Sequence, residues 1–249
     1  INLASPDDTL RARSFAAFRE ELLRCERLGV PFLVSHPGSA TDGDRASAID
    51  RNADELTRAL ESVRGHTVVL LETTAGCGSA LGAQLEELAT LRARVGAGVR
   101  GRVGFCVDTC HVWAAGYDLR DDYAGVTAAM DELLGREHVR LFHLNDSVGG
   151  LGSRRDRHAH IGAGALGERA FAALVRDAAE PLVSGPELLA PERGVYHQPV
   201  LRPPVLGEHH RVRARRGVVA DHDLEQPIDP VVERAERLGP LVEVDEVPV

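Results

Sequence analysis

The chain has 249 residues, of which 27% are charged and 43% hydrophobic; this supports one sizeable domain and excludes disorder over most of its length. No run of about 18 apolar residues and no signal-peptide pattern is present, so we expect a cytoplasmic protein without a membrane span. The formal net charge of −9 argues against broad, non-specific nucleic-acid binding, and four cysteines are too few for a disulfide scaffold.

Strand and helix patterns alternate through the first 178 residues. Short apolar runs predict strands at residues 31–35, 67–71, 102–107 and 139–144. Helical patterns predict helices over 5–28, 46–63, 80–94, 122–135 and 167–178. We expect the first helix to begin with Ser5 as its N-cap and Pro6 in its first turn, and to end at Gly29. The repeat of about 36 residues is typical of βα units in a parallel sheet, and thus of an α/β fold.

Each predicted strand runs into a residue that can ligate a metal or act in catalysis. These residues are His36, Glu72, Asp108 and His143, at spacings of 36, 36 and 35 residues. In a parallel α/β barrel the carboxyl ends of the strands all point to one face, which carries the active site. The pattern therefore predicts a functional site on that face.

Two further pairs lie in the loops that follow the strands. Asp108 and His111 are three residues apart, and Asp156 and His158 lie in a glycine- and arginine-rich loop, GGLGSRRDRHAHIGAG. Mixed nitrogen and oxygen ligands suit Zn²⁺ or Mn²⁺ better than Ca²⁺ or Mg²⁺. A carboxylate among them can bridge two ions, an arrangement that serves phosphoester hydrolysis.

Several segments resemble the endonuclease IV family of zinc-dependent apurinic/apyrimidinic endonucleases. They are VSHPGS (34–39), LLETTAGCGS (70–79), CVDTCHVWAAGYDL (106–119), HLNDS (143–147) and GSRRDRHAHIGAG (152–164). The resemblance runs from Ile1 to about residue 177. It implies a (β/α)8 TIM barrel of the endonuclease IV and xylose isomerase-like type, three zinc ions, and cleavage of DNA 5′ to abasic sites in base excision repair.

The resemblance also implies roles for individual residues. His36 would bind the first zinc, Glu72 would bridge the first and second, and Asp108 with His143 would complete the second. The third zinc would be held by three residues: His111, Asp156 and His158. A further zinc-binding glutamate is expected near residue 188, for which Glu187 is the nearest candidate; Glu72 and Glu187 would be the catalytic carboxylates.

Other residues of the motifs would face the substrate. Arg154, Arg155 and Arg157 would contact phosphates of double-stranded DNA that contains an abasic site. Alternatively, they are only the solvated charges of an exposed loop. Asn145 and Asp146 would lie beside the metals or the substrate. Trp113 would pack the loop after the third strand. Cys77 stands where the family usually has glutamine.

The pattern departs from the family at both ends of the chain. The family has a zinc-binding histidine just before the segment that matches Ile1–Leu3, and ten of the 13 prolines lie after residue 178. We therefore expect an incomplete barrel over residues 1–177, a divergent, poorly ordered tail over residues 178–249, and two to three zinc ions or manganese. We also expect a monomer of low stability with weak or no activity.

Two other functions fit part of the pattern. A metal-dependent sugar isomerase or epimerase of the same barrel superfamily also places histidines and carboxylates at strand ends, and normally holds one or two ions. An inactive remnant that only binds damaged DNA is the second alternative. The DTCH and DRH segments favour the nuclease, and the number of bound metal ions separates it from the isomerase.

Overall fold

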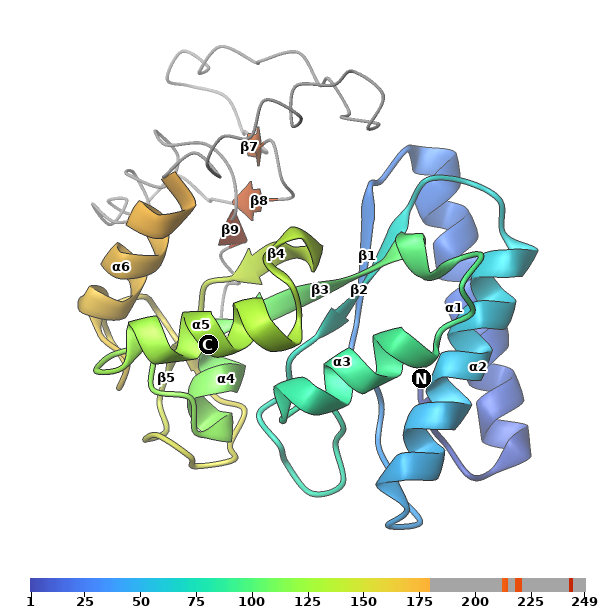
Figure 1. The fold of residues 1–249 in the computed structure, drawn as a ribbon, viewed down its shortest axis with the longest axis horizontal. Helices are drawn as coiled ribbons and strands as arrows, with labels where there is room; N and C mark the ends of the chain where they lie inside the picture. The colour runs from blue at the N-terminus through green and yellow to red at the C-terminus, as the bar shows by residue number, and fades with distance from the viewer. Residues whose placement is uncertain (180–211, 215–217, 221–241, 244–249) are drawn as a thin grey trace.

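The structure is a computed structural model that describes residues 1–179, 212–214, 218–220 and 242–243. Its main sheet contains four parallel strands in chain order, β1 (Phe32–Ser35), β2 (Val68–Glu72), β3 (Val103–Asp108) and β4 (Val139–His143), and then the short β9 (Val242–Glu243) beside β4 (Figure 1). Two small antiparallel pairs join β5 (Asp146–Ser147) to β6 (His158–Ala159) and β7 (Val212–Ala214) to β8 (Val218–Ala220). All four predicted strands are confirmed.

Helices precede, connect and follow the parallel strands. They are α1 (Asp8–Leu28), α2 (Arg45–Ser62), α3 (Leu85–Arg94), α5 (Tyr123–Leu133) and α6 (Glu168–Ala179), with a short α4 (Thr109–Ala115) directly after β3. Two 3₁₀ turns, η1 (Arg100–Arg102) and η2 (Arg136–His138), lead into β3 and β4. This alternation is that of a TIM barrel, of which the described residues form part.

The two faces of the sheet belong to two separate hydrophobic clusters. Val69, Leu71 and Phe105 point towards the helices and join the large core, which includes Phe18 and Leu56. The residues between them point to the other face and form a second cluster of Leu70, Cys106 and Leu141. Successive side chains of a strand alternate between faces, so a barrel strand contributes to both a helix-covered layer and the barrel interior.

The start of the first helix differs from the prediction. The N-cap is Asp7, whose carboxylate accepts hydrogen bonds from the backbone N–H groups of Thr9 and Leu10. Ser5 instead accepts a hydrogen bond from the N–H of Asp7, so it supports the turn before the helix. Asp is as good an N-cap as Ser and lies closer to the apolar repeat. The predicted end is confirmed, because Gly29 adopts a left-handed φ of 67° there.

Two other expectations concern the chain as a whole. Among the described residues, no helix is long and apolar enough to cross a membrane. The cysteines carry free thiols; Cys106 and Cys110 are buried and Cys77 is exposed. The predicted tail, residues 178–249, lies almost entirely outside the described residues.

Candidate metal centre

The ends of the four parallel strands bring their polar residues together. Strand register places Glu72 beside Cys106 and Asp108 beside His143. His36, one residue beyond β1, lies with its Nε2 3.0 Å from Glu72 Oε2. His143 Nδ1 lies 2.8 Å from the other oxygen of the same carboxylate. Glu72 therefore stands between two imidazoles from strands on either side of β2, which is the position that a bridging ligand needs.

Helix α4 places His111 in the same cluster. The carboxylate of Asp108 is the N-cap of this helix and accepts a hydrogen bond of 2.9 Å from the His111 N–H. The His111 ring is buried, and its Nδ1 lies 2.8 Å from the Thr73 carbonyl oxygen. Because a carbonyl only accepts, it selects the tautomer with the proton on Nδ1 and leaves the Nε2 lone pair for a metal.

The loop between β5 and β6 supplies the remaining two candidates. The carboxylate of Asp156 lies between two rings, 3.2 Å from His111 Nε2 and 3.2 Å from His158 Nε2. His158 Nε2 is also 3.8 Å from Asp108 Oδ2. Asn145 donates a hydrogen bond of 2.7 Å to that same Asp108 oxygen, which fixes the orientation of the carboxylate.

The residues present fit zinc. Potential ligand atoms lie within 4.8 Å of one another in four groups, three of them being His36 with Glu72 and His111, Glu72 with Cys106 and His143, and Asp108 with His111 and His158. The fourth contains Cys110, Asp156 and His158. The Nε2 atoms of His111 and His158 are buried and make no hydrogen bond of acceptable geometry within the described structure. Buried imidazole nitrogens that aim at carboxylates without such bonds are typical of metal ligands.

The charges of the cluster favour a cation. Burial opposes ionisation of Glu72, but its contacts with His143 and His36 outweigh burial and lower the pKa of the carboxyl to about 2. Burial likewise opposes protonation of His111, yet Asp156 and Asp108 raise its pKa to about 9. Without metal, the His111 ring thus takes up a proton beside these carboxylates, and a bound metal ion would displace that proton.

Seven of the eight predicted ligands lie in this cluster: His36, Glu72, Asp108, His111, His143, Asp156 and His158. The eighth, Glu187, lies outside the described residues. Glu243 was not among the predicted ligands, and it pairs in register with His143 at the end of β9. Only two apolar residues, Leu241 and Val242, come directly before it, so the sequence has no apolar run there like the one before Glu72. Cys106 and Cys110 adjoin the ligands.

Arg154, Arg155 and Arg157 lie on the exposed loop that also carries Asp156, next to the cluster. We call residues 149–157 the arginine loop. Asp146 was expected beside the metals or the substrate. Its buried carboxylate instead accepts hydrogen bonds from backbone N–H groups of the 160–167 loop. Asn145 does lie beside a candidate ligand.

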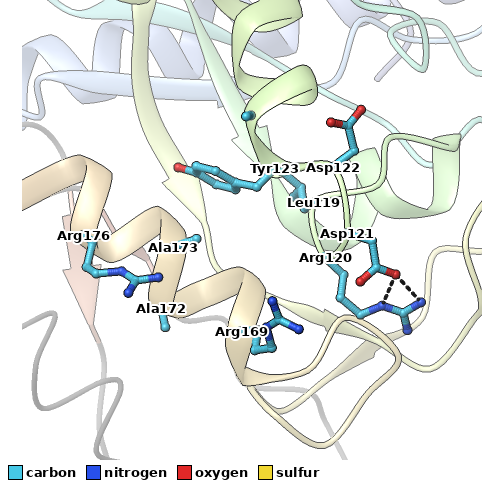
Figure 2. A pocket seen from close by; sticks show the side chains of 10 residues that line it. Leu119, Arg120, Asp121, Asp122, Tyr123, Arg169, Ala172, Ala173 and Arg176 are labelled. Carbon is cyan, nitrogen blue, oxygen red and sulfur yellow. Dashed lines mark hydrogen bonds and ion pairs between the residues drawn. The ribbon is translucent and has the colours of Figure 1, made fainter.

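A separate hollow of about 690 Å³ lies between the start of α5 and α6. Arg120, Arg169 and Arg176 line it together with Asp121 and Tyr123, and Arg120 pairs with Asp121 at 3.0 Å (Figure 2). None of the seven candidate ligands that the structure describes lines this hollow. The arrangement at the strand ends is therefore the site that combines converging ligands with shifted pKa values.

Parallel βα units with a cluster of candidate metal ligands at the strand ends are typical of TIM-barrel enzymes. The sequence profile of the family described as "Xylose isomerase-like TIM barrel" matches residues 1–192. A "Probable endonuclease 4" of Chloroflexus aggregans is 52% identical over 180 residues, which cover 71% of this chain and 62% of that protein. One of Trichlorobacter lovleyi is 42% identical and covers 78% of this chain and 69% of that protein.

A solved structure supports the same relationship. The crystal structure of endonuclease IV from Thermus thermophilus matches with a TM-score of 0.61 and 38% identity, over 75% of this chain and 67% of that one. The chain belongs to the endonuclease IV family of xylose isomerase-like TIM barrels. It spans about 62% of the length of the Chloroflexus aggregans relative.

Proposed function

We propose that the chain carries the metal centre of a DNA repair endonuclease that hydrolyses the phosphodiester bond 5′ to abasic sites and leaves a 3′-hydroxyl. The observation that carries this proposal is the convergence of four imidazoles and three carboxylates at one end of a parallel sheet, in a chain of the endonuclease IV family. A cluster of this size exceeds the needs of a single ion. It supports a centre of two to three zinc ions.

The contacts within the cluster suggest how the ligands would be shared. His36 would serve a first zinc and His143 with Asp108 a second, with Glu72 between them because it contacts both imidazoles. His111, Asp156 and His158 would serve a third, since both rings lie 3.2 Å from the Asp156 carboxylate. When bound, zinc supplies Lewis-acid chemistry that activates water and neutralises charge on a phosphodiester.

Residues of the chain itself would orient the centre and the substrate. The Thr73 carbonyl holds the His111 ring in one tautomer, and Asn145 holds the Asp108 carboxylate. Arg154, Arg155 and Arg157 would bind phosphates beside the centre, so that attraction to DNA is local although the net charge is −9. An abasic nucleotide lacks base stacking, which lowers the cost of turning it out of the duplex into the site.

The test uses the whole chain, loaded with zinc, and an end-labelled duplex with one abasic site. We expect zinc-dependent incision 5′ to the lesion, two to three zinc ions per chain, and loss of incision in Asp156→Asn. An intact duplex is the substrate control. Asp131→Asn, at an exposed position of α5, is the variant control and should cut normally. Zinc-loaded chain that binds the duplex without cutting it, or that isomerises sugars instead, refutes the proposal.

A further inference from the structure

The arginine loop is a segment that needs external support. It joins β5 to β6, contains Gly149, Gly150 and Gly152, and is largely exposed. A glycine-rich chain loses much conformational entropy when it is ordered, and exposed arginines contribute little packing to offset that loss. The loop nevertheless carries a candidate metal ligand and three of the proposed phosphate contacts. Other parts of the fold must therefore determine its position.

One support comes from the end of α4, which lies beside the loop (Figure 1). The Trp113 indole N–H donates a hydrogen bond of 2.9 Å to the Gly149 carbonyl, and the Trp113 carbonyl accepts one of 3.0 Å from the Gly152 N–H. The Trp113 side chain is among the most deeply buried in the chain. Trp113 thus holds the backbone of an exposed loop at two points, one through its buried ring and one through its own backbone carbonyl.

A second support comes from the loop between β2 and α3. The Cys77 thiol donates a hydrogen bond to the Arg154 carbonyl, with Sγ and O 3.0 Å apart. On the other side, the Arg154 N–H donates one of 2.9 Å to the Ala114 carbonyl. Arg154 has a φ of 52°, in the left-handed region. Among the described residues it is the one non-glycine residue with this backbone conformation. A non-glycine residue keeps this conformation only when its surroundings hold it.

We propose that Trp113 and Cys77 are positioning residues that fix the arginine loop, and with it Arg154 and Asp156, beside the metal centre for DNA binding. The proposal rests on the proposed function, because DNA is the ligand for which the loop is positioned. Trp113 acts through its N–H and Cys77 through its S–H. The arginines themselves make the contacts with phosphate.

Limited digestion with trypsin tests the position of the loop without any DNA, because trypsin cuts after Arg154, Arg155 and Arg157. We expect Cys77→Ala to raise the cleavage rate in the loop about two- to five-fold, the effect of one lost hydrogen bond. Cleavage after Arg27, at the end of α1, is the internal reference. Cys77→Ser keeps a donor of similar size and should restore most of the protection.

Trp113→Phe should raise cleavage in the loop by a similar factor. Because this buried substitution can also loosen the core, Cys77→Ala at its exposed position is the decisive variant. If Cys77→Ala is cut at the wild-type rate, or Cys77→Ser is cut as fast as Cys77→Ala, the thiol hydrogen bond does not hold the loop and the proposal is wrong.

A DNA-binding assay on the same variants measures the Kd for a duplex with one abasic site. Their zinc content is measured in parallel. We expect Cys77→Ala to raise the Kd about two- to five-fold at unchanged zinc content, and Cys77→Ser to restore it. An unchanged Kd in a variant whose loop is cut faster refutes the positioning role. If the wild-type chain does not bind the duplex, the proposed function fails, while the digestion still decides whether the two residues hold the loop.

Discussion

Asp146 organises the chain that follows the candidate metal centre, and its removal has a cost that can be estimated. The carboxylate is fully buried. One oxygen accepts hydrogen bonds from two backbone N–H groups and the other from three, at 2.7–3.1 Å; the donors are Ser147, Leu166, Gly162, Gly164 and Gly167. A single side chain thus satisfies five donors that no strand or helix partner serves.

Asp146→Asn replaces one acceptor oxygen with an NH₂ donor. Whichever way the amide turns, at least two backbone N–H groups lose their acceptor. Hydrogen bonds to a charged group contribute about 1.5–3 kcal/mol each, so their loss would cost about 3–6 kcal/mol. Rearrangement of the loop and entry of water recover part of this cost. We therefore expect the free energy of unfolding to fall by about 2–4 kcal/mol.

Urea unfolding of the metal-free chain, followed by the fluorescence of Trp113, measures this change. Asp131→Asn is the control, because its side chain is 47% exposed and its nearest cation lies 3.7 Å away. The control should change the unfolding free energy by less than about 0.5 kcal/mol. If Asp146→Asn is also within that limit, the five hydrogen bonds do not determine the structure of the 160–167 loop and the reasoning is refuted.

Two further predictions concern the metal centre. The pKa of Glu72 is lowered to about 2, so its contribution to stability is present above the ordinary value near 4.5 and is lost as the pH falls towards 2. Glu72 should account for up to about 3 kcal/mol of the unfolding free energy that the metal-free chain loses over this range, and Glu72→Gln should lose correspondingly less. Removal of zinc with a chelator should lower the melting temperature, and a Tm that does not depend on zinc would contradict binding to the folded chain.

The sequence predicted the parts of the structure that depend on periodicity. The repeat of about 36 residues placed His36, Glu72, Asp108 and His143 at strand ends, and parallel strands necessarily bring their ends to one face. His111 was predicted from its spacing to Asp108, although the reason for that spacing was not apparent. The structure shows the reason for the spacing, because Asp108 caps the helix on which His111 lies.

Contacts between distant segments were not predictable in the same way. Helix α4 has only seven residues, too few for a hydrophobic period to identify it, and its N-cap is a candidate ligand. Trp113 was expected only to pack its loop, because nothing local shows that its N–H reaches Gly149. Asp146 was expected beside the metals or the substrate on the basis of its position in a motif, whereas four of its five donors lie 16–21 residues further along the chain.

The candidate ligands are spread from residue 36 to residue 158, on four strand ends, one short helix and one hairpin. An ion held by them would act as a reversible cross-link between segments that are far apart in the chain. Cross-links of this kind stabilise a fold mainly by reducing the freedom of the unfolded chain, and long closed loops gain the most. Metal binding and the order of the whole strand-end face would then be a single cooperative event.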